Sequence, residues 1–275
     1  MSASAPFRVG LVQMVSTPSV AENLAAAAKL VAEAARQGAK LVVLPEYFCI
    51  LGMRDTDKVA AKESDGAGPI QEFLSEAARR HGVWLVGGSV PLACPDPGKV
   101  RNSCLVYDSG GRRVARYDKI HLFGLELGAE RFDEARTIEA GTEPCAVESP
   151  FGRLALSVCY DVRFPELYRA LAPMDVILVP SAFTATTGRA HWETLLRARA
   201  IENLAWVLAP AQGGTHANGR QTHGHSMVVD PWGKVVVERA TGAGVVVADI
   251  DPAFQARMRG SLPALTHRVL GPGRG

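Results

Sequence analysis

Short apolar runs alternate with helix-type segments along most of this chain, and that alternation limits its possible folds more than any other feature. Typical runs are Leu41-Val42-Val43-Leu44 and Val176-Ile177-Leu178-Val179, each between a charged residue and a proline. Runs of this length fit buried β-strands and fall far short of the ~20 residues that span a bilayer. Strands that alternate with helices favour a mixed or parallel sheet covered by helices. We therefore expect an α/β protein without a membrane helix.

Turn and capping residues predict where the main elements begin and end. The run Ser19-Val20-Ala21-Glu22 resembles a capping box, so an Ala-rich helix should begin there and stop at Gly38. Pro69 fits the first turn of another helix, which should stop at Gly82. A β-hairpin is expected around Ser109-Gly110-Gly111. The other expected elements are strands over 7–14, 41–44, 83–86, 154–158, 176–179 and 206–209, helices from Pro165 and around 191–203, and a second hairpin that turns at 231–233.

The chain has no Gly/Ser linker, charge block or internal repeat that would divide it. Its 275 residues lie near the upper end of the range for one α/β domain. We expect a single domain over residues 1–275, with a core from about 7 to 260 and a C-terminal tail over 261–275. The Pro/Gly-rich end of that tail, from Gly271, should fray.

Charge and cysteine content exclude several classes of protein. Lys and Arg total 30 against 28 Asp and Glu, so a broadly basic nucleic-acid-binding protein is not expected. Residues 1–6 lack a basic segment followed by an apolar core, which predicts a cytoplasmic protein. The five cysteines are odd in number and form no C-x-x-C pair, so we expect free thiols rather than a disulfide framework.

Three chemically reactive residues follow three predicted strands. Glu46 comes just after the strand 41–44, Lys119 after the second strand of the first hairpin, and Cys159 after the strand 154–158. Sites in open α/β sheets form where the carboxyl ends of strands meet, so the three side chains are expected in one pocket. Taken singly, they also fit a solvated loop acid, a charged strand end and a buried thiol. Cys159 stands out because a helix predicted from Pro165 follows it, and a sharp strand-to-helix turn presents a nucleophile.

Together, these residues suit the hydrolysis of an amide. The Cys159 thiolate would attack the carbonyl carbon, and Glu46 would move the proton from the thiol to the departing amine. Lys119 and the backbone N–H of Tyr160 would stabilise the oxyanion, and water would hydrolyse the resulting thioester. The Lys119 ammonium is also expected to favour the thiolate. No metal is needed, and no cofactor is expected because Gly87-Gly88 lacks the G-x-G-x-x-G spacing.

The segments around these residues resemble the motifs of the nitrilase superfamily of carbon–nitrogen hydrolases. They are Leu44-Pro45-Glu46, Asp118-Lys119-Ile120-His121-Leu122-Phe123 and the run from Cys159 to Leu167, and the resemblance extends from about Val9 to Arg268. It implies an α-β-β-α sandwich of two mixed sheets. It also implies a homodimer or larger homo-oligomer, in which helix faces pair to give four layers.

The residues after the cysteine resemble one branch of that family. Cys-Tyr-Asp-x-Arg-Phe-Pro-Glu resembles the Nit amidases, whereas true nitrilases typically have Cys-Trp-Glu. The run Met227-Val228-Val229-Asp230 is closer to the deaminated glutathione amidases than to the omega-amidases, which act on 2-oxoglutaramate and 2-oxosuccinamate. The resemblance therefore implies a small amide substrate that carries a carboxylate, with deaminated glutathione first. An omega-amidase and an N-carbamoyl amino acid hydrolase are the enzyme alternatives.

The resemblance also implies supporting residues. Glu134 matches a family glutamate that positions Lys119 or the substrate. Arg163 is a candidate for binding a substrate carboxylate, since its guanidinium pairs with carboxylates in a bidentate manner; it also suits bonding to the turn or pairing with Glu166. Phe183 and His191 lie in matching segments and are the other candidate substrate-binding residues. Departures from the family pattern occur at Arg189, Gly213 and the segment 124–131, which we expect to rim the pocket.

Two other functions fit some of the same residues. A Cys–His hydrolase would pair Cys159 with His121 or with His191, which is predicted near a helix start, but neither has a recognisable orienting residue. A metabolite-binding protein without activity would use the same pocket, although a pure binding protein has no need for a nucleophile beside a base. The arginines at 112, 113, 116, 197 and 199 fit surface charges in a nearly neutral chain better than a nucleic-acid site.

Overall fold

Two β-sheets pack face to face in the computed structural model, which describes residues 5–128 and 130–270. The predicted fraying from Gly271 lies outside the described residues. Across the first sheet the strands are β15 (Gly244–Ile250), β1 (Phe7–Gln13), β2 (Leu41–Val43), β3 (Trp84–Val86), β5 (Val100–Tyr107) and β4 (Val90–Ala93), and β6 (Arg113–Asp118) also pairs with β5. Across the second sheet they are β14 (Val235–Arg239), β13 (Ser226–Val229), β12 (Trp206–Ala209), β11 (Val176–Leu178), β10 (Gly152–Leu156) and β9 (Cys145–Ser149).

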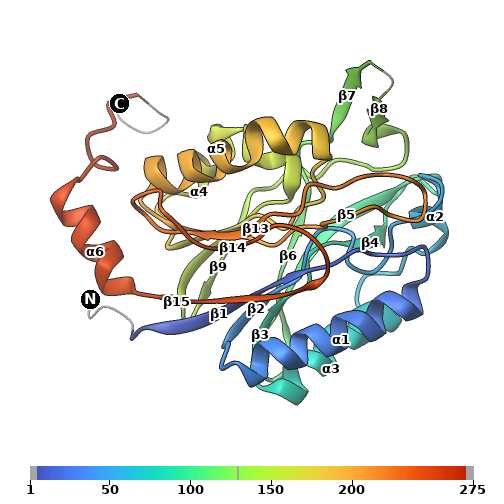
Figure 1. Cartoon of the computed structure of the whole chain (residues 1–275), viewed down its shortest axis with the longest axis horizontal. Helices are drawn as coiled ribbons and strands as arrows, with labels where there is room; N and C mark the ends of the chain where they lie inside the picture. The colour runs from blue at the N-terminus through green and yellow to red at the C-terminus, as the bar shows by residue number, and fades with distance from the viewer. Residues whose placement is uncertain (1–4, 129, 271–275) are drawn as a thin grey trace.

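Helices cover the outer face of each sheet (Figure 1). The first sheet is covered by α1 (Val20–Arg36) and α3 (Pro69–His81), and the second by α4 (Pro165–Leu171) and α5 (Ala185–Asn203). The remaining helical elements are α2 (Asp57–Ala60), the 3-10 turns η1 (Glu134–Arg136) and η2 (Cys159–Arg163), and α6 (Pro252–Ser261). The predicted α-β-β-α sandwich of two mixed sheets is therefore confirmed.

Uninterrupted apolar strands arise because the first sheet is buried on both faces. Leu41 and Val43 point into the core between the sheets, whereas Val42 between them packs under the helices α1 and α3. Leu11 and Val12 of β1 divide in the same way. Side chains alternate between the two faces of a strand, so a strand covered on both sides must be apolar at successive positions.

Most predicted boundaries are confirmed to within a few residues. Ser19 caps α1 by accepting a hydrogen bond from the Glu22 backbone N–H, but the Glu22 carboxylate binds the Thr17 hydroxyl instead of completing a capping box. Gly82 ends α3 in the left-handed conformation, as its lack of a side chain allows. Both predicted hairpins are present.

The expectation that α5 begins near His191 is wrong. The helix begins at Ala185, where the Thr184 side chain accepts a hydrogen bond from the Thr187 N–H. Two threonines and Gly188 in the first turn have low helix propensity, so the sequence pattern did not indicate that the helix begins here. The N-cap and packing stabilise this first turn instead. His191 consequently lies inside the helix rather than at its N-terminus.

The segment 124–131 belongs to a hairpin that the sequence did not reveal and that ends at Asp133. It consists of β7 (Gly124–Leu127) and β8 (Glu130–Asp133), which protrude from the upper side of the molecule in Figure 1. Its strands lie outside both large sheets and are largely exposed, so they carry no buried apolar run for a pattern to detect.

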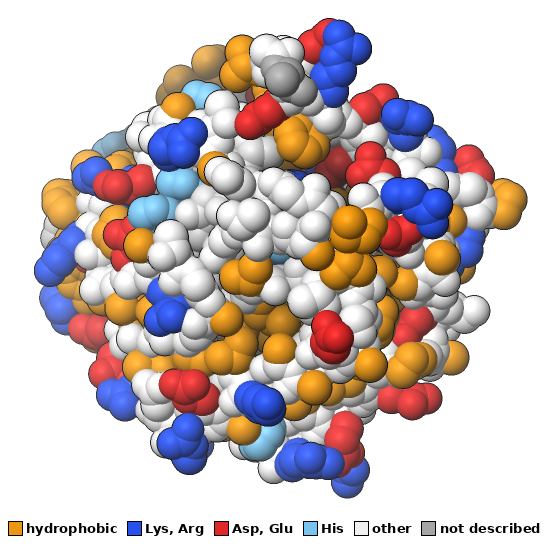
Figure 2. Space-filling model, turned by 45° about the vertical axis from the view of Figure 1, so that its right-hand side comes forward, with side chains coloured by type: hydrophobic (Ala, Val, Ile, Leu, Met, Phe, Trp, Pro, Cys, Tyr) orange, Lys and Arg blue, Asp and Glu red, His pale blue; other side chains and the backbone are white. Residues whose placement is uncertain are grey.

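Charges of both signs are mixed on the face of the molecule drawn in Figure 2, where acidic and basic side chains are interspersed rather than gathered by sign. In the described ranges 5–128 and 130–270, no helix is both long enough and apolar enough to cross a membrane.

Strand directions bring two of the three reactive residues to one end of the first sheet. Strands β2 and β3 are parallel, and β6 is antiparallel to β5, which is itself antiparallel to β3. The carboxyl ends of β2 and β6 therefore face the same way, with Glu46 and Lys119 just beyond them. Cys159 follows β10 of the second sheet, so the sandwich must bring the two sheets together to form a site.

Candidate active site

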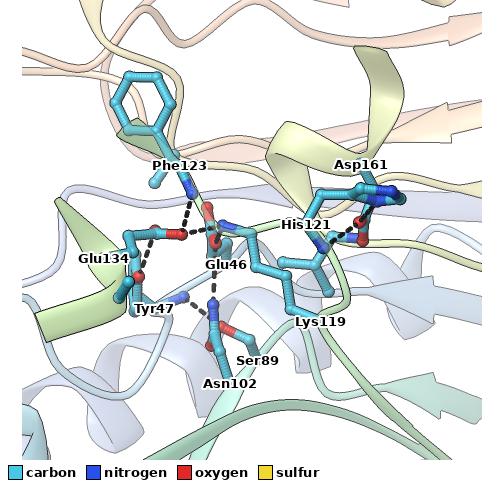
Figure 3. Close-up of polar contacts among 12 residues, drawn as sticks. Glu46, Tyr47, Ser89, Asn102, Lys119, His121, Phe123, Glu134 and Asp161 are labelled. Carbon is cyan, nitrogen blue, oxygen red and sulfur yellow. Dashed lines mark hydrogen bonds and ion pairs between the residues drawn. The ribbon is translucent and has the colours of Figure 1, made fainter. Parts of the chain in front are cut away.

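Lys119 lies between two carboxylates in the interior of the protein (Figure 3). Its Nζ donates hydrogen bonds to Glu46 Oε1 at 2.9 Å and to Glu134 Oε2 at 2.8 Å. The Lys119 side chain is fully buried, and those of Glu46 and Glu134 are 1% and 12% exposed. The structure thus brings together these three residues that the sequence singled out.

The two carboxylates decide the charge of this cluster. Burial alone would lower the pKa of Lys119, but the charges of Glu134 and Glu46 raise that pKa above its ordinary value. Burial opposes ionisation of Glu134, yet the Lys119 ammonium and its hydrogen bond hold the pKa of that carboxyl below its usual range. Lys119 and Glu134 therefore form a charged pair near neutral pH.

Further contacts hold each carboxylate in place. Glu46 Oε1 also accepts a hydrogen bond from Asn102 Nδ2 at 3.0 Å. Glu134 accepts hydrogen bonds from the Tyr47 hydroxyl and the Phe123 backbone N–H, both at 2.8 Å. In the described chain Glu46 Oε2 makes no hydrogen bond, and Glu46 lines the pocket described below. One oxygen of Glu46 is thus held by the protein, and the other is available to accept a proton.

Cys159 occupies a strained turn at the start of η2. Its backbone has a φ of 52°, in the left-handed region that residues with a side chain rarely adopt. The backbone N–H of Cys159 bonds to the Pro180 carbonyl at 3.0 Å, and the Val158 N–H bonds to Asp161 at 2.8 Å. The next N–H, that of Tyr160, lies in the first turn of a helix, where N–H groups lack an intrahelical acceptor. This arrangement resembles the strand-to-helix turns that present nucleophiles.

Asp161 connects the cysteine turn to the segment that carries Lys119. Its fully buried carboxylate accepts hydrogen bonds from the Tyr117 hydroxyl at 2.7 Å and from the His121 backbone N–H at 3.1 Å. His121 Nδ1 contacts the same carboxylate at 2.7 Å. Tyr117 and His121 flank Lys119 on either side along the chain. The Asp161 carboxylate, two residues after Cys159, therefore fixes the segment that carries Lys119 relative to the turn that carries Cys159.

The charge around Cys159 favours the thiol over the thiolate. Burial raises the pKa of the Cys159 thiol well above its ordinary value, and the Glu46 carboxylate raises it further. Lys119 lowers that pKa, as the sequence led us to expect, but the lowering is outweighed. The expected influence of Lys119 is therefore confirmed in its direction, but burial and the neighbouring carboxylates have the larger effect on the pKa of this thiol. A thiol that keeps its proton needs a base to remove that proton as it attacks.

A titration checks this protonation state. We expect no thiolate absorbance attributable to Cys159 between about pH 6 and pH 9, because the pKa of its thiol lies above the ordinary thiol value. The measurement is the ultraviolet difference between wild type and Cys159→Ser across that range. A thiolate signal near neutral pH that disappears in the variant would contradict the expectation and indicate a preformed ion pair.

Cys159, Glu46 and Glu134 line a pocket with an empty space of about 270 Å³. Its lining combines charged side chains with aromatic rings. The other lining residues are Phe123, Tyr160, Arg163, Ala182, Phe183, Thr184, Thr187 and Arg220. The predicted residues Tyr160, Arg163 and Phe183 are therefore brought to the same pocket as Cys159.

Arg163 lies among aromatic rings and next to a histidine. Its guanidinium carbon is 5.6 Å from the Tyr160 ring centre and 5.3 Å from that of Phe183. Arg163 Nη1 lies 3.2 Å from His191 Nδ1, so the structure gives the arginine a histidine partner in place of Glu166. His191 itself is exposed and is not among the described residues that line the pocket. Its contact with substrate stays a prediction, and the structure shows it in contact with Arg163.

The two histidines of the Cys–His alternative have other partners. His121 binds Asp161 and stacks on Phe164, with ring centres 3.8 Å apart. His191 contacts Arg163. Neither imidazole lines the pocket formed by the described residues. The geometry therefore favours Glu46 over a histidine as the base for Cys159.

Sequence reasoning missed three residues that shape this site. Asn102 and Tyr47 hold the two carboxylates, and Arg220 lines the pocket. An asparagine two residues before the apolar end of β5, Cys104–Tyr107, is a signal that could have been noticed, because buried amides need partners. Arg220 lies in a segment between β12 and β13 without any motif, so only the fold reveals it.

Comparisons with known proteins show which family the chain resembles over nearly its full length. Residues 8–259 match the carbon-nitrogen hydrolase family. The chain is 42% identical over 270 residues to a deaminated glutathione amidase from Synechocystis, covering 96% of this chain and 98% of that protein. It is 37% identical over 268 residues to the omega-amidase NIT2 of Xenopus tropicalis, covering 96% and 95%. The crystal structure of Saccharomyces cerevisiae Nit3, a member of branch 10 of the nitrilase superfamily, superposes with a TM-score of 0.89 at 29% identity, covering 98% and 99%.

The family match covers nearly all of the described chain, and the relatives named above are amidases. The chain belongs to the carbon–nitrogen hydrolase family. The resemblance to the Nit amidases and the prediction of an amide-hydrolysing enzyme are confirmed.

Proposed function

We propose that Cys159, Glu46 and Lys119 form the catalytic triad of an amidase that works through a thioester. The observation that carries this proposal is the arrangement of one buried ammonium between two carboxylates, beside a cysteine in a strained turn. Glu134 is proposed as the residue that positions Lys119, since its carboxylate accepts a hydrogen bond from the ammonium at 2.8 Å.

In the first half of the reaction, the substrate carbonyl carbon is placed next to Cys159. The thiol proton passes to Glu46 as the sulfur–carbon bond forms, and the carbonyl oxygen becomes an oxyanion. Lys119 and the Tyr160 backbone N–H stabilise that oxyanion. The carbon–nitrogen bond then breaks, and the amine leaves with the proton that Glu46 held. A thioester on Cys159 remains.

In the second half, the same groups act on water. Glu46 removes a proton from a water molecule, whose oxygen attacks the thioester carbon. The oxyanion forms again in the same position, and the carbon–sulfur bond breaks. Cys159 recovers its proton from Glu46, and the carboxylic acid product leaves. Glu46 gives up its proton again by the end of each half of the reaction. The same carboxylate therefore acts first as a base and then as an acid in both halves.

We propose deaminated glutathione as the substrate. The relative from Synechocystis bears that activity in its name and matches nearly the full length of both chains. The pocket supports a substrate with carboxylates, because it is lined by two arginines, Arg163 and Arg220, neither of which has a carboxylate within 4 Å among the described residues. Hydrolysis of this compound, a damaged metabolite, would make the enzyme a metabolite repair amidase.

Release of 2-oxoglutarate tests the substrate. Deaminated glutathione and 2-oxoglutaramate both yield this product, so one coupled assay gives kcat/KM for each. We expect the higher kcat/KM with deaminated glutathione, and no release from either by Cys159→Ser. Preference for 2-oxoglutaramate would make the protein an omega-amidase, the second candidate, which the Xenopus relative favours. Release from neither substrate would overturn the substrate proposal and direct the search to carbamoyl amino acids and other amides.

Other expectations stay predictions. The homodimer with four layers, or a larger homo-oligomer, concerns contacts between chains, and the structure contains one chain. The single domain over 1–275 and the cytoplasmic location also stay predictions. A metabolite-binding protein is disfavoured, because the chain belongs to a family of hydrolases and brings Glu46 and Cys159 to one pocket.

A further inference from the structure

Arg220 lies where three cavities meet. It lines the active-site pocket, a cavity of about 330 Å³ next to Tyr47 and Lys58, and an outer cavity of about 1070 Å³ bounded by the β7–β8 hairpin and the start of α5. It is the one residue, within the described ranges, that all three share. Arg163, by contrast, lines the active-site pocket alone. The two arginines therefore occupy different positions along the route into the site.

The guanidinium of Arg220 is held in place but not neutralised. Its Nη2 donates a hydrogen bond to the Ala182 carbonyl at 2.8 Å, and its carbon Cζ lies 5.2 Å from the centre of the Phe132 ring. Its Nε is buried and has no hydrogen-bond partner among the described residues. No carboxylate of those residues lies within 4 Å of it. A buried donor without a partner on a fixed cation is uncommon, and a bound anion would satisfy both.

The reaction decides which part of a substrate comes near Arg220. The acyl group stays attached to Cys159 in the small pocket while the amine departs. The outer cavity offers the larger space, with Arg220 at its junction with the pocket. An amine that carries a peptide-like chain must extend past this junction during the attack. The acyl side is assigned to Arg163 because, of the three cavities, that arginine lines only the active-site pocket.

We propose that Arg220 binds a carboxylate on the leaving-amine side of the substrate and so selects amides with an anionic, peptide-like leaving group over primary amides. The inference rests on the proposed function, because it assumes that Cys159 holds the acyl group. Arg163 then binds the carboxylate of the acyl part, which both classes of amide share. A planar guanidinium suits this task because it forms two parallel hydrogen bonds with a carboxylate.

The test compares two substrates in matched variants. In Arg220→Gln, kcat/KM for deaminated glutathione should fall about 10–100-fold, the loss expected for one charge-assisted hydrogen-bonded contact. For 2-oxoglutaramate, whose leaving group is ammonia, it should stay within about threefold. Arg220→Lys should restore part of the loss, since it keeps the charge without the planar geometry. Arg163→Gln should reduce kcat/KM for both substrates to a similar degree.

Two controls separate this contact from other effects. Arg131→Gln removes one positive charge from the exposed hairpin, at a side chain that lines none of the three cavities. This variant should leave kcat/KM unchanged for both substrates. A wild-type assay with deaminated glutathione amidated at its C-terminal carboxylate should lose as much kcat/KM as Arg220→Gln loses with the free acid. In Arg220→Gln, this amidated substrate should show little further loss.

The possible failures are distinguishable. If wild type hydrolyses neither substrate, the proposed function is wrong and this inference falls with it. If wild type is active and Arg220→Gln lowers kcat/KM equally for both substrates, Arg220 supports the pocket as a whole. The specificity role is then overturned. If Arg220→Gln changes neither substrate, Arg220 does not contact the leaving group. Thermal unfolding of each variant shows whether a loss of activity reflects a loss of folded protein.

Discussion

Replacing Cys159 by serine is expected to lower kcat/KM at least about 10³-fold while the protein stays folded. The serine hydroxyl fits the same turn, so the backbone contact with Pro180 is kept. A hydroxyl is, however, a far weaker acid than a thiol, and Glu46 cannot remove its proton as readily. The measurement is steady-state release of 2-oxoglutarate from deaminated glutathione, with circular dichroism to confirm the fold.

Other cysteines supply the matched control for this substitution. Cys94 and Cys145 are free, partly buried and outside the pocket lining, so Cys94→Ser and Cys145→Ser should retain nearly full activity. A mass increase equal to the acyl group, found on acid-quenched wild type and missing from Cys159→Ser, would identify the thioester. Activity above a few per cent of wild type in Cys159→Ser would contradict nucleophilic catalysis by this residue.

Replacing Lys119 by methionine is expected to abolish activity and to reduce the free energy of unfolding by about 3–5 kcal/mol. The substitution leaves the carboxylates of Glu46 and Glu134 in the interior without their shared cation. The loss should be measured by urea unfolding near neutral pH. The Cys159→Ser variant supplies the reference, since it removes activity without removing a buried charge.

A second substitution and a pH series test the cause of that loss. Adding Glu134→Gln to Lys119→Met should restore part of the stability but no activity, because one unpaired charge is removed while the ammonium remains absent.

In wild type, Lys119 holds the pKa of Glu134 below its unfolded value. This pair therefore stabilises the fold at neutral pH, and stabilises it less as the pH falls through that lowered pKa. In Lys119→Met the carboxylates are unpaired, so acid should narrow the stability difference from wild type. If Lys119→Met loses less than about 1 kcal/mol of unfolding free energy at neutral pH, the ammonium is not needed to balance the charges of this cluster.

Much of the fold could be predicted because its elements carry local signals. The double burial of the first sheet requires continuous apolar runs, and Leu41-Val42-Val43 is one. Pro69 and Gly82 bound α3 because their backbone preferences act within a few residues. The β7–β8 hairpin and the true start of α5 escaped prediction because their signals are weak. The hairpin is exposed, and the first turn of α5 is stabilised by Thr184 and by packing rather than by helix propensity.

The candidate site divides in the same way. Residues at the ends of strands belong to motifs, so the amino-acid sequence was enough to single out Glu46, Lys119 and Cys159. Arg220 could not be found in this way, because its relevance depends on where a segment without a motif crosses the pocket. For His191, a matching segment indicated substrate contact, and the tertiary structure adds that its exposed side chain contacts Arg163.

The amino-acid sequence by itself determined the fold class, the family and the three residues proposed for catalysis. Each of these depends on residue type and on spacing along the chain, which local backbone preferences and hydrophobic burial translate directly into strands, helices and turns. The tertiary structure alone decided the raised pKa of the Cys159 thiol, the hydrogen bonds that link Asp161 to Tyr117 and His121, and the position of Arg220 in the lining of three cavities. These properties depend on burial and on distances between residues far apart in the chain, and electrostatic energies in a protein follow from those distances.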